Sequence, residues 1–139
     1  MQNILFLCVA NSARSQMAEG LARQILGPDY FIQSAGSKPA FVHPLAIQVL
    51  AEKGIDSSLQ RSKSVHEMDL SQIDWVITLC AEEVCPVVSG SVQRLHWPLP
   101  DPAAPAESES DRLAAFRQVC EQLSERLVQF KADSLSEPR

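Results

Sequence analysis

Residues 4–15 constrain the fold more than any other part of the chain. The apolar run Ile4-Leu5-Phe6-Leu7 is followed directly by Cys8, and five residues separate Cys8 from Arg14-Ser15. The apolar run is typical of a buried strand, and apolar side chains recur at helical spacing after Arg14. A strand, a short loop and a helix in this order place the loop at the carboxyl end of the strand, where α/β sheets bind their ligands.

The composition of this loop is suited to a tetrahedral oxyanion. Its backbone N–H groups can converge on one point, the helix directs its positive end to that point, and the Arg14 guanidinium matches two oxyanion oxygens. These surroundings favour a thiolate at Cys8, which we interpret as a nucleophile, although a strand-end cysteine can also be buried and inert. The expected oxyanion-binding residues are Val9, Ala10, Asn11, Ser12, Ala13, Arg14 and Ser15.

Two of the loop residues have a further expected role. Asn11 tolerates the left-handed backbone that such a loop needs, and its side chain can tie the loop to a neighbour. Ser15 can donate its hydroxyl to Cys8 and so stabilise the thiolate.

Size and composition predict one globular domain. The chain has 139 residues, of which 45% are hydrophobic, as in ordinary single domains. The formal net charge of −5 argues against nucleic-acid binding, and no apolar run has the length of a membrane span. Met1-Gln2-Asn3 leads into a strand without a basic segment, so we expect no signal peptide and a cytoplasmic monomer. Four cysteines in such a chain indicate reactive or metal-binding thiols.

Apolar periodicity and turn residues predict alternating strands and helices. We expect strands at 3–8, 30–34, 75–79 and 92–97, and helices at 14–26, 44–53 and from about residue 110. We expect a turn at Ala35-Gly36-Ser37, irregular backbone at 57–64, a proline-rich loop at 98–107 and a frayed tail at 133–139. The alternation predicts a single α/β domain over residues 1–139, a three-layer sandwich with a central four-stranded parallel sheet.

Asp101 is a second candidate for chemistry. It precedes Pro102 on the proline-rich loop, and a carboxyl that leans over the oxyanion loop would act as general acid toward a displaced oxygen. An aspartate before proline is also a common turn residue. The presence of the Cys8 loop favours the catalytic interpretation.

Cys80 and Cys85 follow the third predicted strand with four residues between them. We interpret them as a redox pair; unrelated core thiols and metal ligands are the alternatives. No second close Cys or His pair completes a tetrahedral metal site, so we expect no metal. Cys8 and Cys80 both lie at strand ends and are expected at the same edge of the sheet. Cys120 lies in the apolar stripe of the last helix and is predicted to be a core residue.

The segment CVANSARSQMAEG at residues 8–20 resembles the thioredoxin-coupled arsenate reductases of the low-molecular-weight tyrosine phosphatase superfamily. The resemblance covers nearly the whole chain. It continues through Ser34-Ala35-Gly36, residues 43–47, Gly54-Ile55-Asp56, Thr78-Leu79-Cys80, Cys85-Pro86, His96-Trp97 and Asp101-Pro102. It implies a low-molecular-weight phosphatase-like fold and the reduction of arsenate to arsenite in arsenic detoxification.

The resemblance also implies a mechanism. Cys8 attacks arsenate held by the loop and Arg14, while Asp101 protonates the leaving oxygen. Cys80 then attacks Cys8 and releases arsenite, Cys85 attacks Cys80, and thioredoxin reduces the resulting Cys80–Cys85 disulfide. No tightly bound cofactor is implied, because the reducing equivalents come from thioredoxin, with glutaredoxin and glutathione as the alternative reductant.

Three positions depart from the family pattern. The spacing between Cys80 and Cys85 is shorter than in well-known members, and Ala13 stands where many relatives carry a cysteine. Lys63 stands at the fourth position of a potassium site that some relatives build, to which Asn11, Glu19 and Ser34 correspond. A lysine ammonium can replace the cation, so we expect the activity to be indifferent to potassium.

Two other functions stay open on the sequence alone. A low-molecular-weight protein tyrosine phosphatase needs only Cys8, Arg14, Ser15 and Asp101 and forms a cysteinyl-phosphate, and weak phosphatase activity is compatible with reduction because phosphate and arsenate share shape and charge. The aliphatic Pro98-Leu99-Pro100 segment offers no ring to receive a tyrosine. A non-catalytic oxyanion or redox sensor would bind arsenate without repeated turnover.

Overall fold

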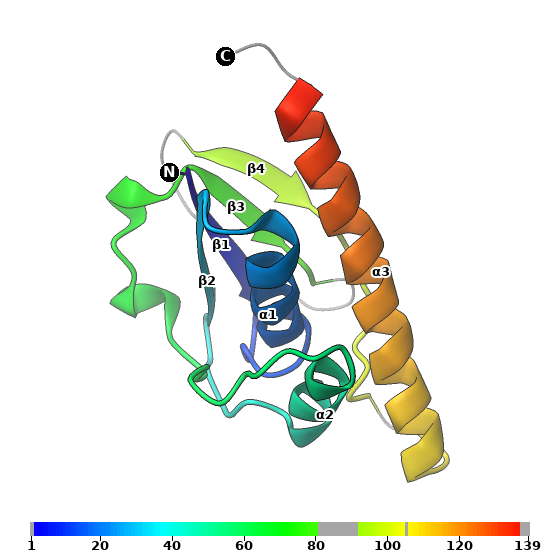
Figure 1. The fold of residues 1–139 in the computed structure, drawn as a ribbon. Helices are drawn as coiled ribbons and strands as arrows, with labels where there is room; N and C mark the ends of the chain where they lie inside the picture. The colour runs from blue at the N-terminus through cyan, green and yellow to red at the C-terminus, as the bar shows by residue number, and fades with distance from the viewer. Residues whose placement is uncertain (1, 81–91, 105, 137–139) are drawn as a thin grey trace.

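The computed structural model describes residues 2–80, 92–104 and 106–136 (Figure 1). The strands are β1 (Gln2–Cys8), β2 (Tyr30–Gly36), β3 (Trp75–Thr78) and β4 (Gln93–His96). The helices are α1 (Arg14–Leu26), α2 (Pro44–Glu52) and α3 (Glu109–Ser136), with single 3-10 turns η1 (Val65–Glu67) and η2 (Leu70–Gln72). The strands pair in parallel in the order β2-β1-β3-β4, which confirms the predicted sheet.

The central strand β1 is buried on both faces of the sheet. Ile4 and Phe6 belong to the larger apolar core beneath the helices, and Leu5 and Leu7 belong to a second core on the opposite face. All four side chains are fully buried. Burial on both faces explains why β1 is a continuous apolar run without alternation.

The sheet lies between two layers. Helices α1 and α3 cover one face, and α2 packs against both of them near the carboxyl end of β1 (Figure 1). On the other face, within the described part of the chain, Val65, Met68 and Leu70 from the segment of η1 and η2 pack against the second core. The predicted three-layer arrangement is confirmed.

The predicted turn at Ala35-Gly36-Ser37 is wrong for its first two residues, because β2 continues through Gly36. Gly36 pairs with Cys8, and its N–H donates to the Lys63 carbonyl at 2.9 Å. A Cβ on Gly36 would lie 2.3 Å from the Val9 carbonyl oxygen. Glycine therefore allows a close approach of two backbones here, and does not mark a turn.

The long helix α3 carries the predicted apolar stripe on its buried side. Phe116, Cys120, Leu123, Leu127 and Phe130 are all buried. The helix runs to Ser136, so the expected frayed tail is helical over residues 133–136. The Gln129 amide donates to the Asp133 carboxylate one turn later, at 2.8 Å. This side-chain pair stabilises the last turns of the helix. Residues 137–139 lie outside the described residues. Among the described residues, no helix combines the length and apolarity that crossing a bilayer requires.

Candidate active site

The loop between β1 and α1 has its carbonyl groups engaged by neighbouring segments. Three backbone N–H groups of residues 38–43 donate to it at 2.9, 3.1 and 3.0 Å: Lys38 to Val9, Ala40 to Ala10 and His43 to Ser12. The Gln16 amide donates to the Asn11 carbonyl at 3.1 Å. In contrast, none of the backbone N–H groups of residues 9–13 donates a hydrogen bond to another described residue. These N–H groups are therefore available to an anion, as in a backbone nest.

Asn11 holds the loop in this form. Its φ of 48° lies in the left-handed region, as predicted, and its side chain is fully buried. The amide nitrogen donates to Ser15 Oγ at 2.7 Å and to Ser34 Oγ at 3.0 Å. The amide oxygen accepts from Gln16 Nε2 at 3.0 Å and from the Lys63 backbone N–H at 2.8 Å. All the polar capacity of this buried amide is thus used in fixing one backbone conformation.

The hydrogen bonds of the Asn11 amide extend through Ser15 to Cys8. Ser34 Oγ donates to the Glu19 carboxylate at 2.6 Å and therefore accepts from Asn11. Asn11 also donates to Ser15 Oγ, which lies 2.8 Å from Cys8 Sγ, and either atom of this last pair can be the donor. The Ser15 hydroxyl is therefore placed where it can donate a hydrogen bond to Cys8 Sγ.

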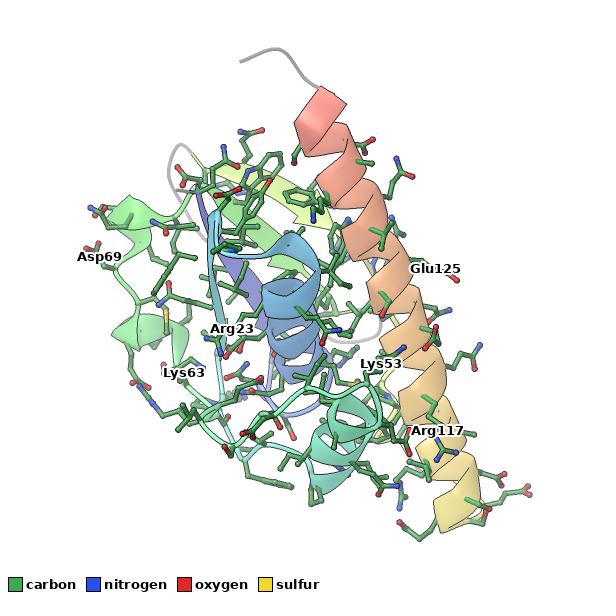
Figure 2. The ribbon with its side chains drawn as sticks, viewed as in Figure 1. Arg23, Lys53, Lys63, Asp69, Arg117 and Glu125 are labelled. Atoms are coloured by element: carbon green, nitrogen blue, oxygen red, sulfur yellow. The ribbon has the colours of Figure 1, made fainter. Side chains whose placement is uncertain are left out.

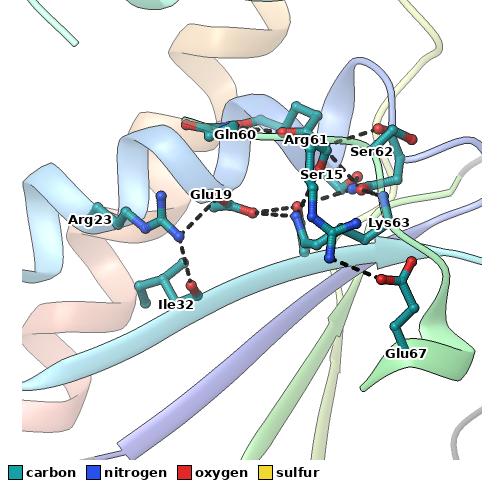
Figure 3. Close-up of polar contacts among 12 residues, drawn as sticks. Ser15, Glu19, Arg23, Ile32, Gln60, Arg61, Ser62, Lys63 and Glu67 are labelled. Atoms are coloured by element: carbon teal, nitrogen blue, oxygen red, sulfur yellow. Dashed lines mark hydrogen bonds and ion pairs between the residues drawn. The ribbon is translucent and has the colours of Figure 1, made fainter. Parts of the chain in front are cut away.

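Glu19 is a buried carboxylate beneath the loop, with two cationic partners (Figure 3). Arg23 Nη2 lies 3.0 Å from one of its oxygens and Lys63 Nζ lies 3.4 Å from the other. Lys63 also donates to the Arg61 carbonyl at 2.8 Å. An ammonium thus stands beside this carboxylate, as expected from the sequence. The described residues contain no group of three or more His, Cys, Asp or Glu side chains that could hold a metal ion.

Arg14 is fixed at the first position of α1. Its side chain is 6% exposed, and its Nη1 donates to the Leu99 carbonyl at 2.9 Å. This contact ties the guanidinium to the loop that follows β4. The N-terminal N–H groups of α1 add a partial positive charge at the same place.

A pocket of about 590 Å³ lies over the loop. Its walls bring Cys8, Arg14 and Asp101 together, as expected, and Phe41 and His43 also line it. One carboxylate oxygen of Asp101 accepts the Ala103 N–H at 2.9 Å. Asp101 is therefore a turn residue that also lines the pocket, and its role as general acid stays a prediction.

Cys80 and Cys120 do not line the pocket. Cys80 follows β3 by two residues, beside the end of β1, but it is buried and does not line the pocket. Cys80 takes part in a disulfide, whereas Cys8 and Cys120 are free thiols. Cys85 lies outside the described residues. Burial raises the pKa of the Cys120 thiol to about 11, as is typical of the predicted inert core cysteine.

Comparison with known proteins identifies the family. Residues 3–138 match the family described as low molecular weight phosphotyrosine protein phosphatase. The chain belongs to this phosphatase family. An arsenate reductase from Halalkalibacterium halodurans is 39% identical over 129 residues, which cover 91% of this chain and 93% of the relative.

Solved structures of arsenate reductases have the same fold. An arsenate reductase in the phosphate binding state has a TM-score of 0.80 at 34% identity, covering 96% of this chain and 98% of its own. A thioredoxin-dependent arsenate reductase from Corynebacterium glutamicum has a TM-score of 0.75 at 29% identity, covering 99% of this chain and 64% of its own. The resemblance noted in the sequence and the phosphatase-like fold are thus confirmed.

Phe41 and His43 line the pocket, but the sequence did not predict them as site residues. His43 is the N-cap of α2, where its Nδ1 accepts the Leu45 N–H at 3.1 Å. The available signal was Pro44, because proline favours the first helical position and so marks the preceding residue as the cap.

The imidazole of His43 lies between two aromatic residues and several charges. Its ring centroid is 6.1 Å from that of Phe41 and 4.7 Å from that of Phe116. Burial, and then the nearby Arg112, lower its pKa below 6.5, while Asp101 and Glu109 partly oppose the shift. The neutral imidazole is therefore favoured at neutral pH.

Proposed function

We propose that the chain reduces arsenate to arsenite through a thiol–disulfide relay of Cys8, Cys80 and Cys85, with thioredoxin as the final reductant. The observation that carries the proposal is the meeting of Cys8, Arg14 and Asp101 in one pocket over a loop with available N–H groups. The arsenate reductase names of the relatives support the substrate. We infer that the enzyme is a cytoplasmic monomer that serves arsenic detoxification.

The first step uses the loop and two side chains. Three oxygens of arsenate accept hydrogen bonds from the N–H groups of residues 9–13 and from Arg14, which places arsenic next to Cys8 Sγ. The Cys8 thiolate, stabilised by the Ser15 hydroxyl, attacks arsenic. An S–As bond forms, an As–O bond breaks, and Asp101 supplies the proton with which the oxygen leaves as water. Arsenic remains in the +5 state in this step.

The second step transfers the electrons. The Cys80 thiolate attacks Cys8 Sγ, an S–S bond forms, and the electron pair of the S–As bond goes to arsenic, which leaves as arsenite. Arsenic gains two electrons and two thiolates become one disulfide. Because Cys80 is 2% exposed, we infer that the chain after β3 rearranges to bring its sulfur to Cys8.

The third step restores the nucleophile. Cys85 attacks Cys80, Cys8 leaves as a thiolate, and the dithiol of thioredoxin reduces the disulfide that remains. A disulfide at Cys80 beside a free Cys8 matches the form that this step leaves, and so supports the order of the relay. The thioredoxin-dependent relative supports the choice of reductant.

Aryl phosphate hydrolysis is a second candidate activity, and one observation favours it. Phe41 is 58% exposed and lines the pocket. The pocket therefore has an aromatic ring that the aliphatic segment 98–100 did not lead us to expect. An aromatic ring beside the nucleophile can stack on an aryl group. Hydrolysis would proceed through a cysteinyl-phosphate at Cys8, with no need for Cys80.

The test is arsenite production with NADPH, thioredoxin reductase and thioredoxin, beside a parallel assay with glutaredoxin and glutathione. Sustained turnover with thioredoxin is the expected result. Turnover with glutaredoxin alone would replace the reductant and remove Cys85 from the relay. No turnover in either assay, together with efficient aryl phosphate hydrolysis, would show a phosphatase.

Cys85→Ser separates the relay from simple oxyanion binding. We expect this variant to release about one arsenite per enzyme and then to stop with Cys8 joined to Cys80, detectable by mass spectrometry of peptides. Cys120→Ser is the matched control and should keep full turnover, because Cys120 is buried outside the pocket. Repeated turnover by Cys85→Ser with thioredoxin would contradict the relay.

A further inference from the structure

The imidazole of His43 has one ring nitrogen without a hydrogen-bond partner among the described residues. The backbone N–H of Leu45 donates to its Nδ1 at 3.1 Å, so in the neutral ring the proton is on Nε2. Among the described residues, Nε2 has no hydrogen-bond partner. The ring therefore presents an N–H donor, and it lines the same pocket as Cys8, Arg14 and Asp101.

The position of this donor is well determined by its neighbours. The His43 backbone N–H donates to the Ser12 carbonyl at 3.0 Å, which ties the residue to the oxyanion loop itself. The ring packs against Phe116, which is fully buried, at a centroid distance of 4.7 Å. A cap, a core contact and a backbone hydrogen bond leave the imidazole little freedom to turn away from the pocket.

A tetrahedral oxyanion bound in the loop has one oxygen that the loop cannot hold. Three oxygens face the N–H groups and Arg14, and the fourth points away from Cys8 toward the mouth of the pocket, since attack must occur in line with the leaving group. Asp101 and His43 are the described titratable residues that line the pocket besides Cys8 and Arg14.

We propose that His43 is a substrate-positioning and specificity residue, whose Nε2–H donates a hydrogen bond to the fourth, outward-pointing oxygen of the bound oxyanion. This inference rests on the proposed oxyanion chemistry and deepens it. In arsenate the fourth oxygen is the one that Asp101 protonates. The neutral donor holds that oxygen beside the acid without adding a cation that would compete for the carboxylate.

The test compares two anions that differ in this oxygen. Inorganic phosphate has four oxygens, whereas methylphosphonate has three and carries a methyl group in the fourth place. Binding of each to the reduced protein is measured by calorimetry at about pH 8, where His43 is neutral. The wild-type chain should prefer phosphate by roughly tenfold, the lower end of what a hydrogen bond to a charged group contributes.

Two variants remove the Nε2–H donor, and each keeps a different structural contact of His43. His43→Ser keeps a capping oxygen for α2 but loses the ring, and His43→Phe keeps the ring against Phe116 but loses both nitrogens. Both should bind phosphate about as weakly as methylphosphonate, with the affinity for methylphosphonate close to that of the wild type. The same variants should lower kcat for arsenate.

The outcomes separate the two proposals. If either variant keeps the wild-type preference for phosphate, His43 does not contact the fourth oxygen. The same conclusion follows if a variant binds both anions more weakly by the same factor, because His43 then acts on the structure alone. If the wild-type chain binds both anions equally, the inference also fails, although the oxyanion site stands. If the wild-type chain binds neither anion, the proposed function fails with it.

Discussion

At the scale of single residues, Gly36 shows how the loop depends on close approach. Its Cα lies so near the loop backbone that an added Cβ would stand 2.3 Å from the Val9 carbonyl oxygen and 2.9 Å from the Asn11 nitrogen. Backbone cannot move aside as a flexible side chain can. The residue therefore positions the loop through the space it leaves, although it makes no side-chain contact.

Gly36→Ala should displace the oxyanion loop. We expect kcat/KM for arsenate to fall roughly 100-fold, which is the effect of moving reacting groups by about 1 Å. Gly27→Ala is the control, because Gly27 has φ +78° but an added Cβ would meet nothing within 4 Å. That variant should lose about 1 kcal/mol of stability from backbone strain and keep its kcat/KM. Equal kcat/KM values for the two variants would refute the positioning role of Gly36.

Lys63 is the second residue whose role is testable alone. With its ammonium 3.4 Å from the buried Glu19 carboxylate, the charge beneath the loop is already compensated. Turnover should therefore be the same in potassium chloride and in sodium chloride of equal ionic strength. Several-fold stimulation by potassium would contradict this view.

Lys63→Gln tests the same contact, because Arg23 is then the one cationic partner that Glu19 keeps among the described residues. We expect a loss of roughly 1–3 kcal/mol in the free energy of unfolding, the cost of leaving a buried charged group short of a partner. Arg61→Gln is the control, since its ion pair with Glu67 lies at the surface and contributes little. Denaturant titration of both variants measures the difference.

At the scale of elements, ion pairs link α2 to α3, and a side-chain cap begins α2. Lys53 and Arg117 reach between α2 and α3, to Glu121 and Glu52 respectively (Figure 2). These pairs are exposed and contribute little to stability. The N-cap of α2 has more consequence, because it joins the helix, the loop and the pocket at His43.

The capping residue His43 makes the free energy of unfolding of the chain depend on pH. Burial and Arg112 lower the pKa of His43 below its usual value of 6.5, with Asp101 and Glu109 opposing. The unfolded chain then binds more protons than the folded one, so stability falls as the pH drops below about 6.5 toward the lower pKa of the folded state. His43→Ser removes this contribution.

The measurement is the free energy of unfolding of the wild-type chain and of His43→Ser from about pH 7.5 down to pH 5.5. The wild-type chain should lose more stability over this range than the variant. His66 and His96 are present in both proteins, so their contributions cancel in the comparison. Parallel pH curves would exclude a depressed pKa at His43.

At the scale of the whole molecule, the far end of α3 closes the core over the amino-terminal edge of the sheet. Phe130 is 6% exposed, and its ring contacts Tyr30, Trp75 and Trp97 at centroid distances of 6.2, 5.1 and 6.2 Å. This aromatic cluster joins the last helix to three strands or their ends. It lies away from the pocket, which Phe130 does not line.

Phe130→Ala should therefore affect stability without affecting the site. We expect a loss of about 3–5 kcal/mol, as for other buried phenylalanines, with phosphate affinity unchanged under folding conditions. Val128→Ala, at a side chain 58% exposed on the same helix, should change stability by less than about 0.5 kcal/mol. A large change in phosphate affinity in Phe130→Ala would mean that α3 transmits strain to the loop.

The local order of the chain determined most of the fold and part of the site. The run Ile4–Leu7 predicted β1, the limits of α1 agree with its predicted range of 14–26, and the stripe of α3 predicted its buried face. These predictions succeed because a period of 3.6 residues, or a short apolar run, is a property of adjacent residues alone. The loop composition likewise placed Cys8, Asn11 and Arg14 together, since all three lie within seven residues.

Tertiary structure decided what depends on segments distant in sequence. The parallel pairing of Gly36 with Cys8 turned an expected turn into strand, and residues 38–43 engaged the loop carbonyls. His43 reached the pocket only because α2 begins beside the loop. No local pattern contains such contacts, because they arise from the packing of α2 and β2 around β1, and the same residues in another topology would face solvent.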